Sequence, residues 1–495
     1  MSLLDNAVIL FYFLLVVFIG LYYSRKREQN STDYFLSGRD AGWFTIGVSL
    51  FATNISSEHF IGLAGSGASR GIAVAPFEWI AVFILLLTGY FLAPLYVKAG
   101  VFTFPEFIGK RFDKKTRLYL TSISILVYIF LKISITLFAG GLLLHEVLNW
   151  NIYTSTIAMV MLTGIYTVIG GMKAVVHTQI FQMVFFLGGA VLMTMFGLHE
   201  VGGLSELYSK LPHDYYSIIK PSTDPDFPWT GILFGAPIIG FWYWCTDQYM
   251  VQRLLSAKSS NDAQKGSYLT AALKILPVFF LVIPGMIAAA LSPDAKGDQA
   301  YPFLLTSRIL PVGIKGFVVA GLFAAIMSSL SAIFNSASAL FTMDIYRILY
   351  PEASERKLVL VGRLATAIMV ISAILWVPMI KLISSEIYIY LQSIQAYIGP
   401  PIVSVFVLGL TYKKVNSRGV IWGLVIGGIL GFARFILEML ARDYDIASNS
   451  LSWFVDINYL HFAIILFIIS SATMILISKI YPLPVLAKVK YKEAS

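Results

Sequence analysis

The sequence predicts an all-α integral membrane protein, and three observations carry that prediction. Of the 495 residues, 58% are hydrophobic and only 13% are charged, against about 25% charged in soluble globular domains. The mean hydropathy is +0.77. So few charged side chains could not cover the surface of a soluble protein of this length. Cys245 is the single cysteine, which excludes an intrachain disulfide and a cysteine metal cluster.

A helix that crosses roughly 30 Å of hydrocarbon needs about 20 mostly apolar residues. Thirteen segments meet this criterion, and each is predicted to span the membrane. The first ends in Ser24-Arg25-Lys26-Arg27 and lacks a small-residue cleavage motif, so we expect it to be retained rather than removed as a signal peptide. In chain order the segments are 6–23, 43–69, 77–97, 118–147, 152–170, 175–198, 228–252, 266–291, 313–344, 359–380, 386–411, 418–439 and 458–480.

Basic residues predict the orientation of these spans. The net charge is +9, and most of the excess falls in alternate loops. The positive-inside rule places those loops in the cytoplasm, with the N-terminus outside and the C-terminus inside a plasma membrane. An excess of this kind does not call for a nucleic-acid partner. The residues are Arg25, Lys26, Arg27, Arg39, Lys110, Arg111, Lys114, Lys115, Lys173, Arg253, Lys258, Lys265, Arg347, Arg356, Lys357, Lys413, Lys414, Lys488, Lys490 and Lys492.

Two predicted spans contain helix breakers beside polar residues. The second carries Asn54-Ile55-Ser56-Ser57-Glu58-His59, and the seventh combines Gly231, Gly235 and Pro237 with a run from Trp242 to Gln248. A glycine-kinked packing helix is the alternative interpretation, but it does not explain the adjacent Asn, Glu, His and Asp. Interrupted helices at corresponding positions of two halves are typical of inverted-repeat transporters, in which unwound carbonyl groups bind a cation.

This interpretation divides a single transmembrane domain into parts. The predicted parts are an extra helix and linker (6–42), a first five-helix repeat (43–198), a second repeat (228–411), two further helices (418–480) and a basic tail (481–495).

Several other polar side chains lie inside predicted spans. Ser328 and Ser329 are adjacent hydroxyls that could bind sodium, since hard cations prefer oxygen ligands; helix packing is the alternative for such a pair. Glu78, Lys274 and Gln392 each interrupt an apolar span. Intramembrane ionisable groups are functional candidates, and a structural Glu78–Lys274 ion pair would be compatible with that role.

Aromatic residues accompany this polar set, and the combination suits a sugar. Phe77, Trp242, Tyr243, Trp244 and Tyr388 would offer flat faces to the C–H surface of a sugar, while amide and charged groups bond its hydroxyls. The chain contains no P-loop, HExxH or GxSxG motif, so no enzyme activity is predicted.

Longer strings of residues resemble the sodium/solute symporter family, and within it the sodium–glucose/galactose cotransporters. The strings WYWCTDQ and FTMDIY are the most specific, and the resemblance extends from the first predicted span to the eleventh. The matching segments are Asp33–Arg39, Ala52–Gly62, Tyr128–Ser134, Trp242–Gln248, Ser328–Ser336, Phe341–Tyr346 and Tyr390–Ile394.

The resemblance implies a LeuT-type fold of five plus five inverted-repeat helices and a sodium-coupled sugar symporter that works by alternating access. It assigns sugar binding to Asn54, His59, Glu78, Tyr243, Trp244, Lys274 and Gln392. It assigns an outer gate to Leu63, Phe77 and Tyr388, with Tyr243 closing the cytoplasmic side. Sodium would bind the carbonyl groups of Ala52, Ile55 and Ala325 and the hydroxyls of Ser328 and Ser329.

Three positions depart from the family pattern. Thr178-Gln179 stands where the family commonly has Thr-Asp, and Ala332 replaces a serine that two-sodium members use. Both changes weaken a second sodium site, so one sodium per sugar is expected. Gln395 stands where close sugar carriers have Thr, which bears on substrate preference.

Other functions within and beyond this fold stay open at this stage. The solute could be an inositol, an amino acid, a sialic acid or a vitamin, or the chain could be a sodium-dependent sensor or channel. The exact sugar and the oligomeric state are not predicted. No Asn-x-Ser/Thr sequon falls in a predicted outer loop, which favours a bacterial inner membrane.

Overall fold

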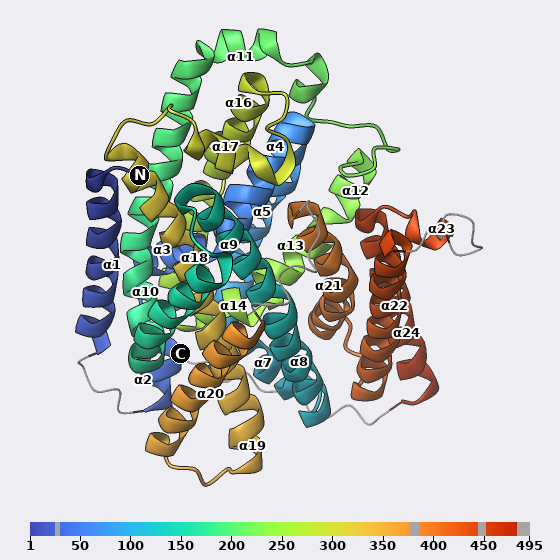
Figure 1. Ribbon diagram of the computed structural model, residues 1–495. Helices are drawn as coiled ribbons and strands as arrows, with labels where there is room; N and C mark the ends of the chain where they lie inside the picture. The colour runs from blue at the N-terminus through green and yellow to red at the C-terminus, as the bar shows by residue number, and fades with distance from the viewer. Residues whose placement is uncertain (25–29, 377–386, 444–451, 483–495) are drawn as a thin grey trace.

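The computed structural model describes residues 1–24, 30–376, 387–443 and 452–482 (Figure 1). These residues form a bundle of helices, and no β-strand occurs among them. The predicted cytoplasmic residues Arg25, Lys26, Arg27, Lys488, Lys490 and Lys492 lie outside the described residues.

The described helices follow the predicted spans in order. They are α1 (Leu3–Ser24), α2 (Ser31–Leu36), α3 (Trp43–Asn54), α4 (Ala64–Arg70), α5 (Ala75–Leu87), α6 (Ala93–Ala99), α7 (Phe104–Arg111), α8 (Lys114–Val127), α9 (Ser134–Leu148), α10 (Ile152–Val201), α11 (Leu204–Lys210), α12 (Trp229–Phe234), α13 (Ala236–Phe241), α14 (Gln248–Leu255), α15 (Ser260–Leu273), α16 (Ile283–Leu291), α17 (Ala300–Thr306), α18 (Ile314–Ala339), α19 (Arg347–Leu349), α20 (Glu355–Trp376), α21 (Ile387–Thr411), α22 (Ser417–Asp443), α23 (Ser452–Val455) and α24 (Tyr459–Ile480).

The second predicted span is broken where its polar run begins. The α-helix α3 ends at Asn54, and Ile55 adopts an extended backbone with φ −76° and ψ 114°. Helical structure resumes in a π-helical turn, His59–Leu63, which continues into α4. Since the last turn of a helix leaves carbonyl groups without helical partners, this break exposes acceptors inside the bundle.

The seventh predicted span is also broken, but not at its glycines. A π-helical turn, Trp242–Thr246, follows α13 and ends at Asp247, whose backbone is extended (φ −75°, ψ 124°). Asp247 then caps α14, because its side chain accepts a hydrogen bond from the Tyr249 N–H at 3.1 Å. The predicted pair of interrupted helices is therefore present, with the second interruption set by Asp247.

Ten helical stretches of the described residues are long and apolar enough to cross a membrane. Two of them are too long for one crossing, since a helix rises about 1.5 Å per residue. His59–Ala99 has 41 residues and α10 has 50. The first contains Gly71 and the second Gly171, both with positive φ (65° and 49°), where glycine permits a sharp change of direction. The chain is a multi-pass helical membrane protein, while the count of thirteen spans stays a prediction.

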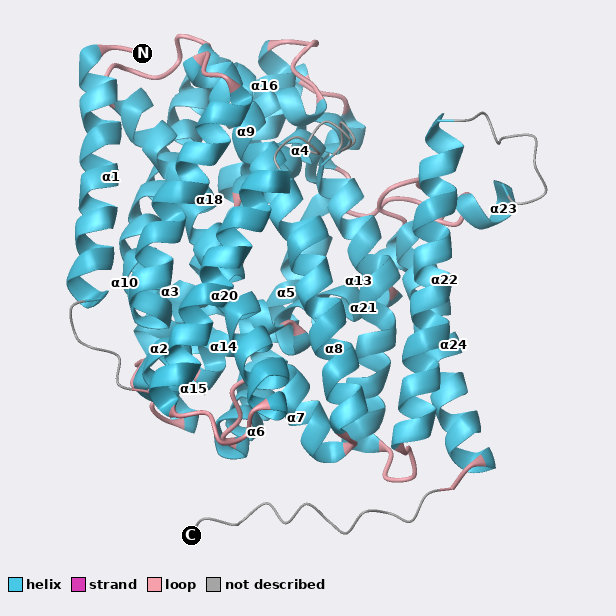
Figure 2. Cartoon of the chain, turned by 60° about the horizontal axis from the view of Figure 1, so that its bottom comes forward, coloured by secondary structure: helices cyan, strands magenta, loops and turns pink. Residues whose placement is uncertain are grey.

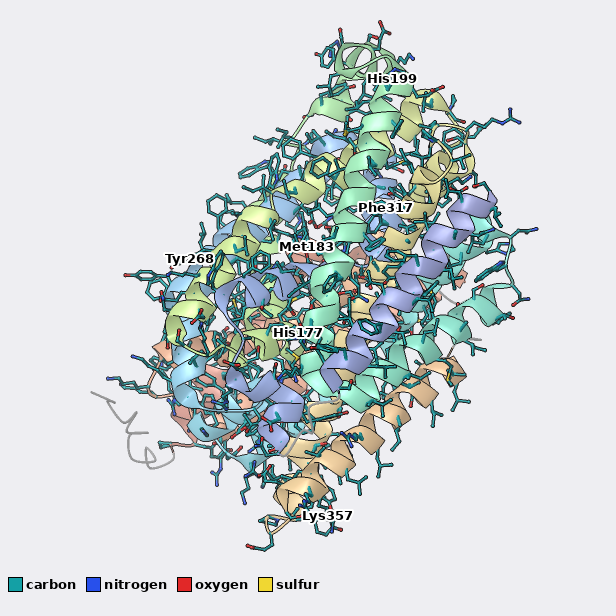
Figure 3. The ribbon with its side chains drawn as sticks, turned by 90° about the vertical axis from the view of Figure 1, so that its left-hand side faces the viewer. His177, Met183, His199, Tyr268, Phe317 and Lys357 are labelled. Atoms are coloured by element: carbon teal, nitrogen blue, oxygen red, sulfur yellow. The ribbon has the colours of Figure 1, made fainter. Side chains whose placement is uncertain are left out.

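At the centre of the bundle lies α18, which packs against α1, α3, α10 and α20. It carries many Ala, Gly and Ser residues, and small residues let membrane helices approach closely. A Cβ atom on Gly321 would lie 2.6 Å from the Phe185 carbonyl oxygen of α10. In side view (Figure 3), α10 extends along the molecule from the labelled His177 to His199. The serines of α18 are thus held deep in the protein.

Several basic residues that are predicted to face the cytoplasm lie at one end of the bundle. In Figure 2 the N-terminus lies at the top, and the loops around α2, α6, α7 and α15 lie at the bottom together with the end of α24. Arg39, Lys110, Arg111 and Lys258 belong to those bottom segments. The grouping agrees with one side carrying the basic loops, as the positive-inside rule requires.

Candidate functional site

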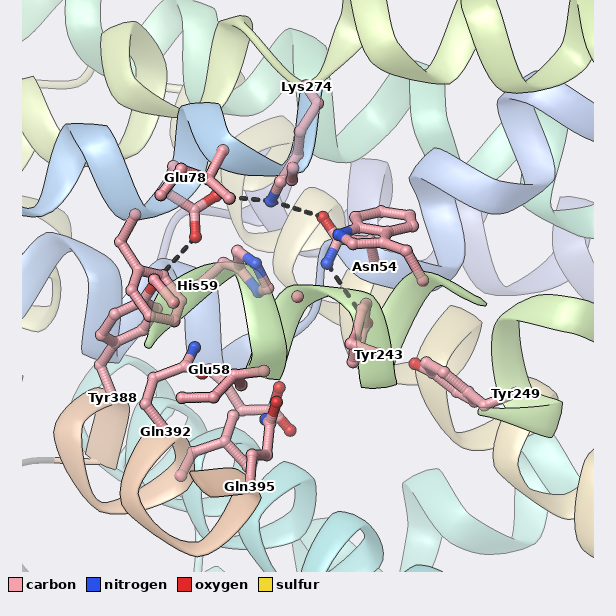
Figure 4. A pocket seen from close by; sticks show the side chains of 18 of the residues that line it. Asn54, Glu58, His59, Glu78, Tyr243, Tyr249, Lys274, Tyr388, Gln392 and Gln395 are labelled. Carbon is pink, nitrogen blue, oxygen red and sulfur yellow. Dashed lines mark hydrogen bonds and ion pairs between the residues drawn. The ribbon is translucent and has the colours of Figure 1, made fainter. Parts of the chain in front are cut away.

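A cavity lies between the two broken helices near the middle of the bundle (Figure 4). Its walls come from the breaks themselves, from α5, α13 and α21, and from residues at the ends of α14 and α15. All the residues predicted to bind sugar line this one cavity. They are Asn54, His59, Glu78, Tyr243, Trp244, Lys274 and Gln392.

Five lining residues form one continuous chain of hydrogen bonds (Figure 4). The Tyr388 hydroxyl donates to Glu78 Oε1 at 2.7 Å, and Lys274 Nζ donates to Glu78 Oε2 at 2.5 Å. The same Nζ donates to Asn54 Oδ1 at 2.7 Å, and Asn54 Nδ2 donates to the Tyr243 hydroxyl at 3.2 Å. The predicted Glu78–Lys274 ion pair is confirmed, and it sits inside the cavity rather than apart from it.

The remaining predicted residues surround this chain. Tyr243 and Trp244 meet edge to face, with ring centroids 5.1 Å apart. His59 Nδ1 is 3.5 Å from the Ser56 hydroxyl, so a residue of the first break orients the His59 ring. Gln392 lies on α21 beside the labelled Tyr388 and Gln395 (Figure 4), and Gln395 also lines the cavity. Flat aromatic faces and amide groups thus converge on one space.

Two of the three predicted outer-gate residues touch. The Phe77 and Tyr388 rings lie 6.1 Å apart between centroids, nearly perpendicular at 79°. Leu63 is buried in the π-helical turn after the first break and is not among the residues that line the described cavity. A Cβ on the neighbouring Gly62 would meet the Tyr388 backbone nitrogen at 2.8 Å, so this turn and α21 are in close contact.

Three residues that line the cavity, Glu58, Lys132 and Tyr249, were given no site role from the sequence. Asp247, which is not among the lining residues, was given none either, and it forms a buried ion pair with Lys132. Asp247 also accepts a hydrogen bond from Tyr128. Lys132 and Asp247 each interrupt an apolar span, so the criterion that selected Glu78 and Lys274 would have found them.

Both ammonium groups that line the cavity are paired with carboxylates. Glu58 and Glu78 are the lining carboxylates, and Lys132 and Lys274 are the lining ammonium groups. Each lysine is already bound to a carboxylate, Lys274 to Glu78 and Lys132 to Asp247. Glu58 accepts from the hydroxyls of Ser56 (2.6 Å) and Thr136 (3.0 Å). A neutral solute would therefore meet no uncompensated ammonium group among these residues.

Two of the five predicted sodium ligands, Ala52 and Ser328, are in contact where the first break faces α18. The Ser328 hydroxyl donates to the Ala52 carbonyl oxygen at 2.7 Å. The next carbonyl oxygen, that of Thr53, accepts from the Tyr249 hydroxyl at 2.6 Å. Carbonyl groups in the last turn of α3 thus accept hydrogen bonds from side chains of other helices, because the end of a helix leaves them without helical partners.

Ser329 supplies the sharpest indication of a ligand at this place. Its hydroxyl is buried and lies near the Tyr249 hydroxyl, but it makes no hydrogen bond of good geometry among the described residues, although buried polar groups are nearly always satisfied. Ala325, one turn before it on α18, is fully buried, and Ile55 follows Ala52 in the break. Hydroxyl and carbonyl oxygens without a thiol or imidazole are the ligands that suit a hard cation.

Gln179 of α10 reaches the same group of oxygens. Its Oε1 accepts from the Ser49 hydroxyl at 2.5 Å. Its Nε2 donates to Thr53 Oγ1 at 2.9 Å, to Ser328 Oγ at 3.2 Å and to the Ser328 carbonyl oxygen at 3.3 Å. The side chain is fully buried, and one of its partners, Ser328, is a predicted sodium ligand.

Comparison with known proteins identifies relatives of the chain. The model of the "Sodium:solute symporter family" matches residues 34–427. "Sodium/glucose cotransporter 2" of Rattus norvegicus is 39% identical over 96% of this chain and 78% of its own length. "Sodium/glucose cotransporter 1" of Oryctolagus cuniculus is 38% identical over the same shares of the two chains. A solved structure of a Na+-coupled sialic acid symporter has a TM-score of 0.83 at 24% identity, over 97% of this chain and 98% of that one.

Proposed function

Because the chain belongs to the sodium:solute symporter family, we propose that it is a sodium-coupled symporter of a glucose- or galactose-like sugar, working by alternating access. The relatives are transporters rather than enzymes, and sodium is the coupling ion in their printed names. Similarity to the sodium/glucose cotransporters over 96% of this chain supports a hexose as the solute.

The observation that carries the choice of a neutral solute is the pairing of both cavity lysines. A carboxylated solute such as a sialic acid or an amino acid is held best by a free cationic group. Lys274 and Lys132 are each bound to a carboxylate. The amide groups of Asn54 and Gln392 and the aromatic faces of Tyr243 and Trp244 suit hydroxyls and C–H surface.

In the proposed mechanism, sodium binds first and prepares the sugar site. Carbonyl groups of Ala52, Ile55 and Ala325 and hydroxyls of Ser328 and Ser329 replace the hydration shell of the ion. Because Ala52 belongs to the broken helix and Ser328 to α18, a bound cation would fix these two helices relative to each other. Asn54 lies two residues beyond Ala52, so this step would also fix the first sugar contact.

Access would then alternate between two gates. Leu63, Phe77 and Tyr388 would close the cavity on the outer side, and Tyr243 would close it toward the cytoplasm. We assign these gates to a LeuT-type arrangement in which helices 43–198 and 228–411 form two inverted repeats. The buried interruptions at Ile55 and Asp247 support that assignment, since such breaks occur at corresponding places of the two halves.

We further place the N-terminus outside and the C-terminus inside a plasma membrane, with thirteen crossings. The clustering of basic residues at one end of the bundle supports this orientation. The lack of sequons in the predicted outer loops supports a bacterial inner membrane.

The test is uptake of labelled solutes into proteoliposomes with and without a sodium gradient. Sodium-dependent accumulation of a hexose, with little uptake of inositols, amino acids or sialic acid, is the expected result. Accumulation of a carboxylated solute instead would contradict the argument from paired lysines. Solute-driven sodium current without net solute uptake would indicate the sensor or channel alternative.

A further inference from the structure

Gln179 presents a donor to a cluster of oxygens that a cation could otherwise bind. Three acceptors surround its Nε2 within 3.3 Å, namely Thr53 Oγ1, Ser328 Oγ and the Ser328 carbonyl oxygen. They come from α3 and α18, while Gln179 itself comes from α10. Ser331 adds a further hydroxyl, which donates to the same Ser328 carbonyl oxygen at 2.9 Å.

The orientation of the Gln179 amide follows from its partners. A carbonyl oxygen can only accept hydrogen bonds, so the atom that faces the Ser328 carbonyl oxygen has to be the amide nitrogen. The amide oxygen then points to the Ser49 hydroxyl, at 2.5 Å. All four contacts agree with this one orientation, and the side chain has no exposed surface.

An amide nitrogen in this position has two effects on a cation. Its N–H groups satisfy oxygens that a second ion would need as ligands, and it cannot itself act as a ligand. The partial positive charge of the N–H₂ group also faces Ser328, which is one of the proposed sodium ligands. A carboxylate of the same length would reverse both effects, because it only accepts and carries a negative charge.

We propose that the Gln179 amide takes the place of a second cation between α3, α10 and α18, and so limits transport to one sodium ion per solute. This inference rests on the proposed sodium-coupled function and names the residue that fixes its stoichiometry. The amide holds the three helices together by permanent hydrogen bonds where an exchangeable ion would otherwise bridge them.

The experiment compares wild type, Gln179→Glu and Gln182→Glu in proteoliposomes. Reversal potentials of sugar-coupled current give the number of charges moved per sugar. Gln182 is the matched control: it lies on the same helix, is equally buried, and its side chain lies near the Tyr12 and Tyr166 hydroxyls. We expect about one charge per sugar for wild type and Gln182→Glu, and a rise toward two for Gln179→Glu, with a sigmoidal sodium dependence.

The outcomes separate the inference from the proposed function. Sodium-independent uptake by wild type would refute the proposed function itself. Coupled uptake with an unchanged ratio in Gln179→Glu, or an equal rise in Gln182→Glu, would overturn the role of Gln179 alone. If Gln179→Glu does not fold, Gln179→Asp tests the same charge with a shorter side chain. A wild-type ratio of two would overturn the inference without any variant.

Discussion

Ser328 and Ser329 are neighbours with the same chemistry but different surroundings. The Ser328 hydroxyl is bonded to Ala52 and faces Gln179, whereas the Ser329 hydroxyl makes no hydrogen bond of good geometry among the described residues. Loss of a made hydrogen bond costs about 1 kcal/mol of stability, but loss of an unmade one costs nothing of this kind. Substituting the two serines one at a time therefore distinguishes a role in binding sodium from a role in stabilising the fold.

We expect Ser329→Ala to raise the sodium half-saturation strongly while the thermal unfolding midpoint stays at the wild-type value. Ser328→Ala is expected to raise the sodium half-saturation and also to lower the midpoint. Sodium titration of uptake and thermal unfolding in detergent measure the two effects. Ser338→Ala is the control, because Ser338 is buried on the same helix but donates to Gly362. A wild-type sodium half-saturation in both site variants would refute the sodium assignment.

Asn54 and Gln392 are expected to act on the sugar rather than on the ion. Replacing either by Ala leaves former partners unpaired, at a cost of about 1–3 kcal/mol, which corresponds to a roughly 5- to 150-fold higher sugar half-saturation. The sodium half-saturation should change much less and serves as an internal control. Kinetics of uptake at saturating sodium measure the effect. Normal sugar affinity in both variants would remove these residues from the site.

The polar side chains within apolar spans singled out Glu78, Lys274 and Gln392, whereas the full set of seven sugar-binding residues came from the resemblance to the symporter family. All seven line the cavity. Apart from the Glu78–Lys274 pair, the hydrogen-bond chain from Tyr388 to Tyr243 could not be predicted, since it joins residues from five segments whose register only the fold fixes. Gln179 was expected to bear on a second ion, but its bonds to Thr53 and Ser328 came from the structure alone.

Among the elements, both broken helices were predicted in the right spans. The prediction for the seventh span rested on its glycines and on the run from Trp242 to Gln248, and the interruption falls within that run at Asp247, where a side-chain cap starts a new helix. Capping is a local signal, but an aspartate in an apolar span can equally be an ion-pair partner. Asp247 is both, and only the position of Lys132 across the bundle reveals the second role.

We expect the stability of the fold to depend strongly on the Asp247–Lys132 ion pair at the second break. Asp247→Asn leaves the buried Lys132 ammonium group without its carboxylate, and breaking a buried pair in this way costs about 3–5 kcal/mol. We expect a clearly lower thermal unfolding midpoint for Asp247→Asn and for Lys132→Met. The double variant should recover part of the loss, since it removes both charges. Additive losses in the double variant would contradict a direct pair.

Over the whole molecule, one sodium per sugar limits how far the solute can be concentrated. A single charge moving through 100 mV supplies about 2.3 kcal/mol, and a tenfold sodium gradient adds about 1.4 kcal/mol. The sum permits roughly 500-fold accumulation at perfect coupling. We expect steady-state accumulation in proteoliposomes under these conditions to stay below that limit. A higher accumulation would require a second ion and would contradict the one-sodium assignment.

The span pattern of the whole chain was largely predictable, because hydrophobic length and basic loops are averages over many residues. Thirteen apolar segments were predicted, and ten helical stretches meet the criteria for length and composition in the described residues. The difference comes from breaks and sharp turns, such as those at Ile55 and Gly171. Such breaks and turns depend on the conformation of single residues, and an average of hydropathy over many residues does not detect them.

The hydrogen-bond chain in the cavity has a consequence for the choice between similar sugars. Tyr388, Glu78, Lys274, Asn54 and Tyr243 are already bonded to one another. A sugar hydroxyl that replaced one of these bonds would gain little net affinity. A stereoisomer that opens the chain without closing it again leaves buried groups unpaired and is rejected. Such a cavity favours discrimination between epimers over tight binding, which suits a carrier that has to release its cargo on every cycle.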